Sequence, residues 1–184
     1  MSAHDDWVRI IAVPVAVFSA VGTVHATQYF SVEQAQRLMF GPGAQFERRD
    51  FRLSKEVSRE VEKASGVRVR LLDVRLWEVR ENDKLSGYFI VDEVYGKHEF
   101  ITYAVALEAD GRLRQIEILD YRETYGYQVR DPAWRAQFVG KTSADPLKFD
   151  KDIRNISGAT LSCRHLTEGV KRLLAIYDRV LRKS

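Results

Sequence analysis

The stretch SGYFIVDEVYGKHEFITYAVALEADGRLRQIEILDYRE, residues 86–123, decides the fold. It contains three largely apolar runs, and short turns separate them at Tyr95-Gly96-Lys97 and at Asp110-Gly111. Such runs, bounded by glycine-containing turns, are typical of strands joined as hairpins. The stretch therefore predicts an antiparallel meander of three strands.

Helical patterns flank this meander on both sides. Ahead of it, residues 31–40 and 53–66 predict helices, with Ser31 and Ser54 as N-caps. After it, a short helix is expected from Asp131-Pro132 to Phe138, and a long helix over residues 161–181. The apolar faces expected for the three longer helices are Val32, Ala35, Leu38 and Met39; Val57, Val61 and Ala64; and Leu166, Val170, Leu173, Leu174, Tyr177 and Leu181.

Between the second helix and the meander, residues 67–79 alternate between apolar and polar and shift register near Leu72-Asp73, which predicts a further strand. The order of helices, strands and helices favours an α+β fold, an antiparallel sheet flanked by helices. No Gly-x-Gly-x-x-Gly follows a strand, so a dinucleotide-binding fold is not supported.

The first 26 residues form a separate unit in this interpretation. An apolar run from Val8 ends at Val24-His25-Ala26, which resembles a small-x-small cleavage site, so residues 1–26 are expected to be an export signal. The remainder divides into an N-terminal helical segment, 27–66, and an α+β domain, 67–184, with 27–184 as one globular unit. The expected location is periplasmic or otherwise extracytoplasmic, and a retained membrane anchor is the alternative.

The composition limits the partners and the side-chain chemistry that this chain can have. The chain has 184 residues, a formal net charge of +3, one cysteine and four histidines. Basic and acidic residues alternate instead of forming a stripe, which argues against a nucleic-acid partner. One cysteine permits no internal disulfide and no thiolate metal cluster, and we expect no metal site. A redox function would therefore need a bound cofactor.

The segment NISGATLSC, residues 155–163, has two interpretations. In one, Ser157-Gly158 ends a loop and Thr160 or Ser162 caps the last helix. In the other, the free N–H groups and the positive dipole end of the helix bind a phosphate, and Gly158 and Ala159 allow close backbone approach. Spacing alone does not choose between them.

The same segment resembles the flavin-attachment motif of the FMN-binding domain family. That family includes the exported flavoprotein subunits of sodium-pumping quinone reductase and of the Rnf electron-transport complex. The resemblance implies that Thr160 carries FMN as a phosphoester, installed by a flavin transferase, with Ser157, Gly158 and Ala159 completing the motif.

Two further segments agree in order and spacing. RETYGYQV, residues 122–129, resembles the family's E-T-P-G-L-G segment beside the flavin ring; Glu123, Thr124 and Gly126 match, and Tyr125 stands in the place of proline. WRAQFVGK, residues 134–141, resembles the stretch that follows it. Tyr125 or Tyr127 could stack against a flavin ring.

The resemblance implies an electron carrier that works with membrane or periplasmic redox partners, and it does not identify catalytic residues. Arg154 stands where the transferase motif has aspartate, so non-covalent FMN is the alternative to the phosphoester. Two other functions stay open: flavin-dependent reduction of a small substrate, and a cofactor-free binding module of the same fold.

Several residues have plainer interpretations. Trp134 and Phe138 are expected in the core, and Cys163 is expected to be a partly buried, unreactive thiol. Ser157 and His165 lack both a third partner and a G-x-S-x-G elbow, which argues against a hydrolase.

Overall fold

A computed structural model describes residues 27–183. The proposed export signal, residues 1–26, lies outside the described residues. Within the described part, no helix has the length and apolar character needed to cross a membrane.

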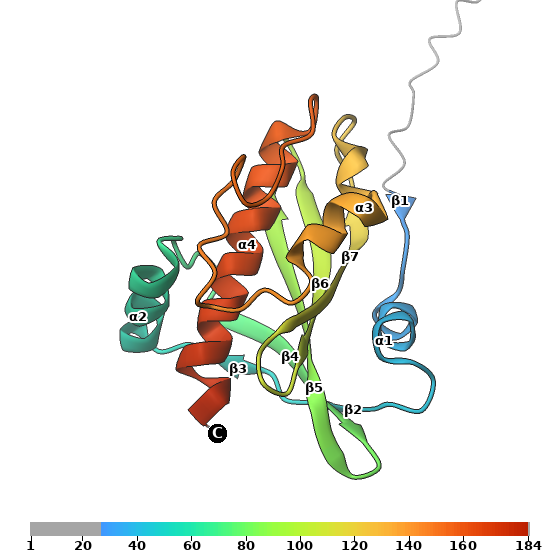
Figure 1. Cartoon of the computed structure of the whole chain (residues 1–184), viewed down its shortest axis with the longest axis vertical. Coiled ribbons are helices and arrows are strands. Elements are labelled where there is room, and N and C mark those ends of the chain that lie inside the picture. Colours follow the sequence, from blue (N-terminus) through green and yellow to red (C-terminus); the bar gives the residue numbers. More distant parts are fainter. Residues whose placement is uncertain (1–26, 184) are drawn as a thin grey trace, which may run out of the picture.

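Seven strands form one antiparallel sheet in the order β1-β7-β6-β5-β4-β2, and β3 pairs beside β2 with the other end of β4 (Figure 1). The strands are β1 (Thr27–Gln28), β2 (Gln45–Arg48), β3 (Phe51–Arg52), β4 (Asp73–Glu81), β5 (Lys84–Tyr95), β6 (Phe100–Glu108) and β7 (Leu113–Tyr121). The predicted meander is confirmed as β5, β6 and β7, which pair in sequence.

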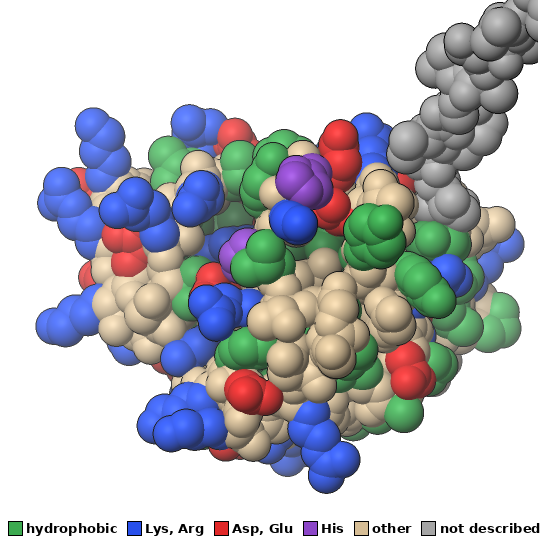
Figure 2. All heavy atoms as spheres, turned by 90° about the horizontal axis from the view of Figure 1, so that it is seen from above, with side chains coloured by type: hydrophobic (Ala, Val, Ile, Leu, Met, Phe, Trp, Pro, Cys, Tyr) green, Lys and Arg blue, Asp and Glu red, His purple; other side chains and the backbone are tan. Residues whose placement is uncertain are grey.

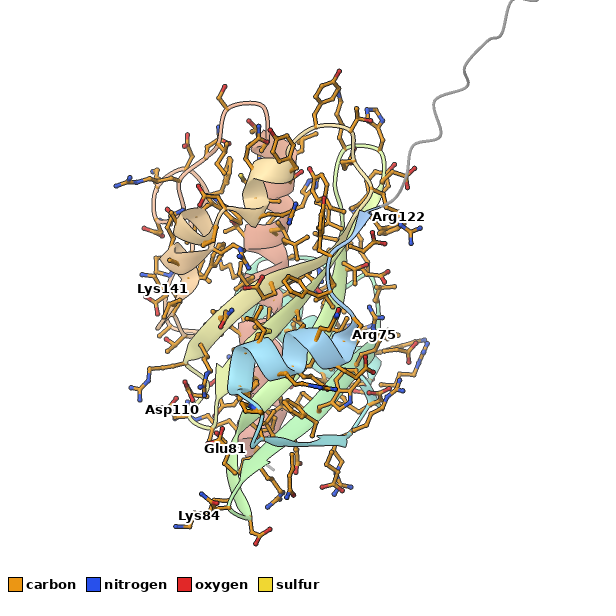
Figure 3. The ribbon with its side chains drawn as sticks, turned by 90° about the vertical axis from the view of Figure 1, so that its right-hand side faces the viewer. Arg75, Glu81, Lys84, Asp110, Arg122 and Lys141 are labelled. Atoms are coloured by element: carbon orange, nitrogen blue, oxygen red, sulfur yellow. The ribbon has the colours of Figure 1, made fainter. Side chains whose placement is uncertain are left out.

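Helices cover both faces of the sheet, which confirms the predicted α+β class. The helices are α1 (Val32–Phe40), α2 (Lys55–Ser65), η1 (Tyr127–Arg130), α3 (Pro132–Arg135), η2 (Ala136–Phe138), α4 (Thr160–Arg179) and η3 (Leu181–Lys183). One core joins α4, α2 and α3 to one face, and a smaller core joins α1 to the other. Figure 3 shows α1 lying across its face of the sheet.

The predicted caps are present. Ser31 accepts a hydrogen bond from the Gln34 amide and Ser54 accepts one from the Val57 amide, so each satisfies an N–H that the helix leaves unpaired. Gly66 ends α2 in the left-handed conformation. The expected apolar stripe of α4 is buried along its whole length.

Three sequence predictions were wrong in detail. Residues 67–72 are not a strand, and β4 begins at Asp73. Leu38 and Ala64 were placed on apolar helix faces but are exposed, because the helices turn Gln36 and Ser65 inward instead. The segment 27–66 is also not purely helical, since three short strands from it join the sheet.

Along the outer edge of β7, hydrogen bonds from β1, from loop backbone groups and from a side chain occupy backbone groups of the strand. Beyond its two-residue pairing with β1, Leu119 O accepts from the amides of Tyr29 and Phe30. Ile116 O accepts from the Arg135 guanidinium at 2.8 Å. Leu113 exchanges backbone hydrogen bonds with residues 140–141.

A buried polar cluster links α4 to the meander. Arg172 forms an ion pair with Asp92, and their side chains are 11% and 12% exposed. The Tyr103 hydroxyl donates to the same Asp92 carboxylate at 2.5 Å. Burial, and then the neighbouring Asp92 charge, raise the pKa of Tyr103 well above its ordinary value, so this hydroxyl stays protonated and remains a donor.

Candidate functional site

The NISGATLSC segment forms the loop that leads into α4. Thr160 is the first residue of the helix and is exposed, and Ala159 is the N-cap. No side chain caps this end, so the predicted capping role of Thr160 or Ser162 is wrong. The amide groups of the first turn therefore keep their capacity to bind an anion.

The residues just before Thr160 differ in exposure. Ser157 and Gly158 are exposed, whereas the Ala159 side chain is 2% exposed and packs into the main core. Gly158 has φ +84°, a conformation that glycine adopts without strain. The loop thus presents backbone and hydroxyl groups, with no bulky side chain at Gly158 to block approach.

The second motif segment lies directly against this loop. A Cβ built on Gly126 would come within 3.4 Å of the Ala159 Cα, 3.1 Å of the Ser162 hydroxyl and 2.6 Å of the Tyr121 hydroxyl. The segment is separated from α4 by more than thirty residues of sequence. A glycine suits this position because its φ is +89° and because a side chain would crowd the Tyr121 and Ser162 hydroxyls. The structure therefore brings the two motif segments together.

Tyr121, the last residue of β7, connects the two segments. Its hydroxyl lies 2.5 Å from the Tyr125 carbonyl oxygen and 3.1 Å from the Ser162 hydroxyl. Sequence reasoning missed both Tyr121 and Ser162 as site residues. The sequence does show a tyrosine at the end of a predicted strand and a serine in the first turn of a predicted helix. Nothing in the sequence indicates that their hydroxyls lie together.

Glu123 is oriented toward the β5–β6 turn. Its Oε1 accepts hydrogen bonds from the amides of Lys97, His98 at 2.6 Å and Glu99 at 3.1 Å. Desolvation acts to raise the pKa of this carboxyl, but the three amides outweigh it and lower the pKa below its ordinary value of 4.5. The charged form of Glu123 therefore holds the β5–β6 turn beside α4.

Replacing Glu123 by glutamine is expected to lower the free energy of unfolding by about 1 kcal/mol at pH 7. Because the folded-state pKa is depressed, this contribution is present above pH 4.5 and is lost as pH falls through the folded-state value. Urea unfolding at pH 7 and pH 3 measures the difference.

Glu99→Gln, in the same turn, is the control and is expected to change stability little at either pH. Equal losses for Glu123→Gln at pH 7 and pH 3 would show that the carboxylate charge has no part in holding the turn.

The two residues between Glu123 and Gly126 are open to solvent. Thr124 is exposed and the Tyr125 side chain is 79% exposed, so neither is committed to the core. The Gln128 amide oxygen is buried without a hydrogen-bond partner among the described residues. This acceptor, two residues after Gly126, is available to a bound donor.

The third motif segment packs in the core and forms hydrogen bonds with the loop that leads into α4. Trp134 and Phe138 are core residues, as expected, and their rings meet edge to face at 5.3 Å. The indole N–H of Trp134 donates to the Arg154 carbonyl at 2.7 Å, and Gln137 accepts from the Arg154 amide. The backbone of Arg154 is fixed, while its side chain is exposed near the start of α4.

The structure also bears on two predictions that involve no cofactor, the unreactive thiol of Cys163 and the absence of a hydrolytic Ser157–His165 pair. Cys163 is fully buried, and burial raises its pKa, so it is an unreactive thiol. The Nδ1 atom of His165 lies 2.5 Å from the Tyr95 carbonyl oxygen, so this nitrogen donates to the β5–β6 turn. Among the described residues, Ser157 and His165 share no hydrogen bond, so a hydrolytic pair has no support.

The site has the donor set that a flavin phosphate requires. An uncapped helix start, an exposed threonine hydroxyl and a close glycine approach lie together, and no large side chain lies within 4 Å of a Cβ built at Gly158. The residues present therefore fit an FMN phosphate at the start of α4.

Comparison with known proteins agrees with this geometry. Residues 96–175 match the family model of the FMN-binding domain, a range that includes all three motif segments. This match confirms the resemblance to the FMN-binding domain family over that part of the chain.

The fold is similar to the crystal structure of Shewanella oneidensis NqrC, with a TM-score of 0.50 and 19% sequence identity. The alignment covers 73% of this chain and 68% of that chain. At this identity the similarity establishes the fold alone. A comparison with curated proteins finds no match.

Proposed function

We propose that this protein is an exported electron carrier that holds FMN through Thr160 at the start of α4. The observation that carries the proposal is the contact of Gly126 with Ala159 and Ser162, which joins the two motif segments at a helix start without a side-chain cap. The resemblance to the FMN-binding domain family implies a role beside redox partners in or near a membrane, and the proposal includes that role.

Each part of the site has a task in this proposal. The first-turn amides and the Thr160 hydroxyl hold the phosphate, and the segment 123–126 lies along the ring. Exposed Tyr125 supplies an aromatic surface for the ring. Bound FMN supplies the one- and two-electron chemistry that the chain's own side chains lack.

Covalent attachment is the form we propose: the exposed Thr160 hydroxyl loses its proton and forms a phosphoester with the flavin phosphate. A flavin transferase would use a donor in which that phosphate is part of a phosphoanhydride, and this anhydride bond breaks and releases the other phosphate group. Asp152, the nearest preceding aspartate, accepts from the Lys148 amide at 2.8 Å and so belongs to the loop structure. Arg154, exposed and without an ion pair in the described part of the chain, places a positive charge near the helix start. It would favour a phosphate even where a transferase does not act.

Thr160→Ala is expected to remove all covalent flavin while leaving the fold intact, because Thr160 is exposed and makes no cap. The protein is exported together with a flavin transferase, denatured and separated on a gel, and flavin fluorescence and intact mass are read from the band. Unaltered protein should give a fluorescent, flavin-heavy band.

Thr124→Ala, which removes another exposed hydroxyl in the site, is the control and should retain the fluorescent band. A fluorescent band in Thr160→Ala would contradict the attachment site. A dark band from yellow native protein means non-covalent FMN, and colourless native protein points to a cofactor-free module.

A further inference from the structure

A cavity lies between α4, the β5–β6 hairpin and the segment that follows α2. Its volume is about 530 Å³, in the range of small-molecule sites. One wall comes from α4 and the ends of β5 and β6, and the other from the segment 67–71. Figure 2, which looks onto this end of the molecule, shows Lys and Arg side chains gathered on the α2 side.

The second wall is a feature of this chain and not of the matched family region. Residues 67–71 precede the match, which begins at residue 96. They follow α2 and belong to no strand. Together with α4 they line the cavity. The cavity therefore depends on sequence that the family assignment does not explain.

The lining includes an exposed apolar patch. Leu71, Tyr95 and Phe100 are each about half exposed, at 54%, 48% and 52%. Tyr95 and Phe100 meet edge to face at 5.3 Å, and the Tyr95 hydroxyl donates to the His98 carbonyl, which fixes the ring. Fixed aromatic edges beside an open apolar side chain suit a planar ring.

The base of the cavity offers hydrogen-bond donors from a buried guanidinium. Arg172 lines the cavity and is 11% exposed, yet within residues 27–183 its hydrogen bonding is limited to Nη2 and the Asp92 carboxylate. Arginine carries five N–H donors in a rigid fork. The donors that Asp92 does not use are available to an anion in the cavity.

The charges of the lining favour a ligand with a single negative charge. Arg68, Arg70 and Arg172 in the lining contribute three positive charges. Two negative charges oppose them, Glu168 in the lining and Asp92, which lies outside the lining and pairs with Arg172. Glu93, also in the lining, is neutralised by Arg75 at 3.1 Å. The site thus keeps one positive charge, and Glu168 opposes a second negative charge on the ligand.

We infer that this cavity binds a planar aromatic monocarboxylate. The ring lies against Tyr95, Phe100 and Leu71, and the carboxylate meets the arginines. The inference does not depend on FMN, because none of the lining residues belongs to the motif segments around Thr160 and Gly126.

The test uses the full chain produced without flavin transferase, so that it is independent of flavin attachment. 2-Naphthoate and its neutral counterpart 2-naphthamide are titrated calorimetrically. Naphthoate is expected to bind at least about tenfold more tightly than the amide, because only the anion uses the arginine donors. Equal affinities, or no binding of naphthoate, would overturn the inference.

Amino-acid substitutions test whether naphthoate binds in this cavity. The double variant Arg68→Gln, Arg70→Gln should lower the affinity for naphthoate by about tenfold. Arg37→Gln, on α1 across the sheet, should leave that affinity unchanged. Thr160→Ala should also leave it unchanged, which separates this cavity from the flavin site. Naphthoate binding that is lost in Thr160→Ala but kept in the double arginine variant would place the ligand in the flavin site and overturn the inference.

Discussion

Replacing Asp92 by alanine is expected to lower the free energy of unfolding by about 3–5 kcal/mol. The substitution leaves the Arg172 charge buried without its partner and removes the acceptor of the Tyr103 hydroxyl. Uncompensated burial of a charge is far more costly than the loss of an exposed ion pair. Urea unfolding monitored by tryptophan fluorescence measures the change.

Asp73→Ala is the matched control. Its carboxylate pairs with Arg52, but both side chains are more than half exposed, so a loss below about 1 kcal/mol is expected. Combining Asp92→Leu with Arg172→Met should recover the part of the loss that comes from the unpaired charge. The part that comes from the Tyr103 hydroxyl should remain, because its acceptor is still missing. Equal losses for Asp92→Ala and Asp73→Ala would contradict the structural role of the buried pair.

Gly126→Ala is expected to lower the free energy of unfolding by about 2–4 kcal/mol and to reduce flavin content. The new Cβ would lie 2.6 Å from the Tyr121 hydroxyl and 3.1 Å from that of Ser162, at a φ of +89°. Relief requires the Tyr121 hydroxyl to move or the segment 123–126 to shift, and either change disturbs the link between Tyr125 and Ser162. Urea unfolding and flavin fluorescence of the purified protein measure the two effects.

Gly140→Ala separates backbone strain from crowding. Gly140 also has a positive φ, +78°, but a Cβ there meets nothing within 4 Å, so only about 1 kcal/mol should be lost. If Gly126→Ala behaves like Gly140→Ala in stability and retains full flavin content, the close approach of the two segments is not needed for binding.

The elements that the sequence predicted well have strong local signals. The meander has long apolar runs with glycine turns, and the caps at Ser31 and Ser54 act within three residues of their partners. Residues 67–72 alternate like a strand, yet no neighbouring strand pairs with them. Alternation reports which face is apolar, but only a hydrogen-bonding partner makes a strand.

The short strands β1, β2 and β3 were missed because two to four residues carry too little periodicity to recognise. In the site, the segments around Thr160 and Gly126 were identified through family resemblance, and the structure places them in contact. Tyr121 and Ser162 were missed because their meeting depends on how β7 and α4 pack, which no local pattern encodes.

The closed edge of β7 has a consequence for how partners recognise this protein. Side-chain and loop groups already occupy the carbonyl oxygens of Ile116 and Leu119 and both backbone groups of Leu113. The opposite edge offers only the four-residue β2 and the two-residue β3. A sheet without a long free run of backbone groups resists extension by a strand from another chain, and that also limits edge-to-edge aggregation. A protein that docks on this sheet would therefore have to be selected through side-chain shape and charge, and not through backbone pairing.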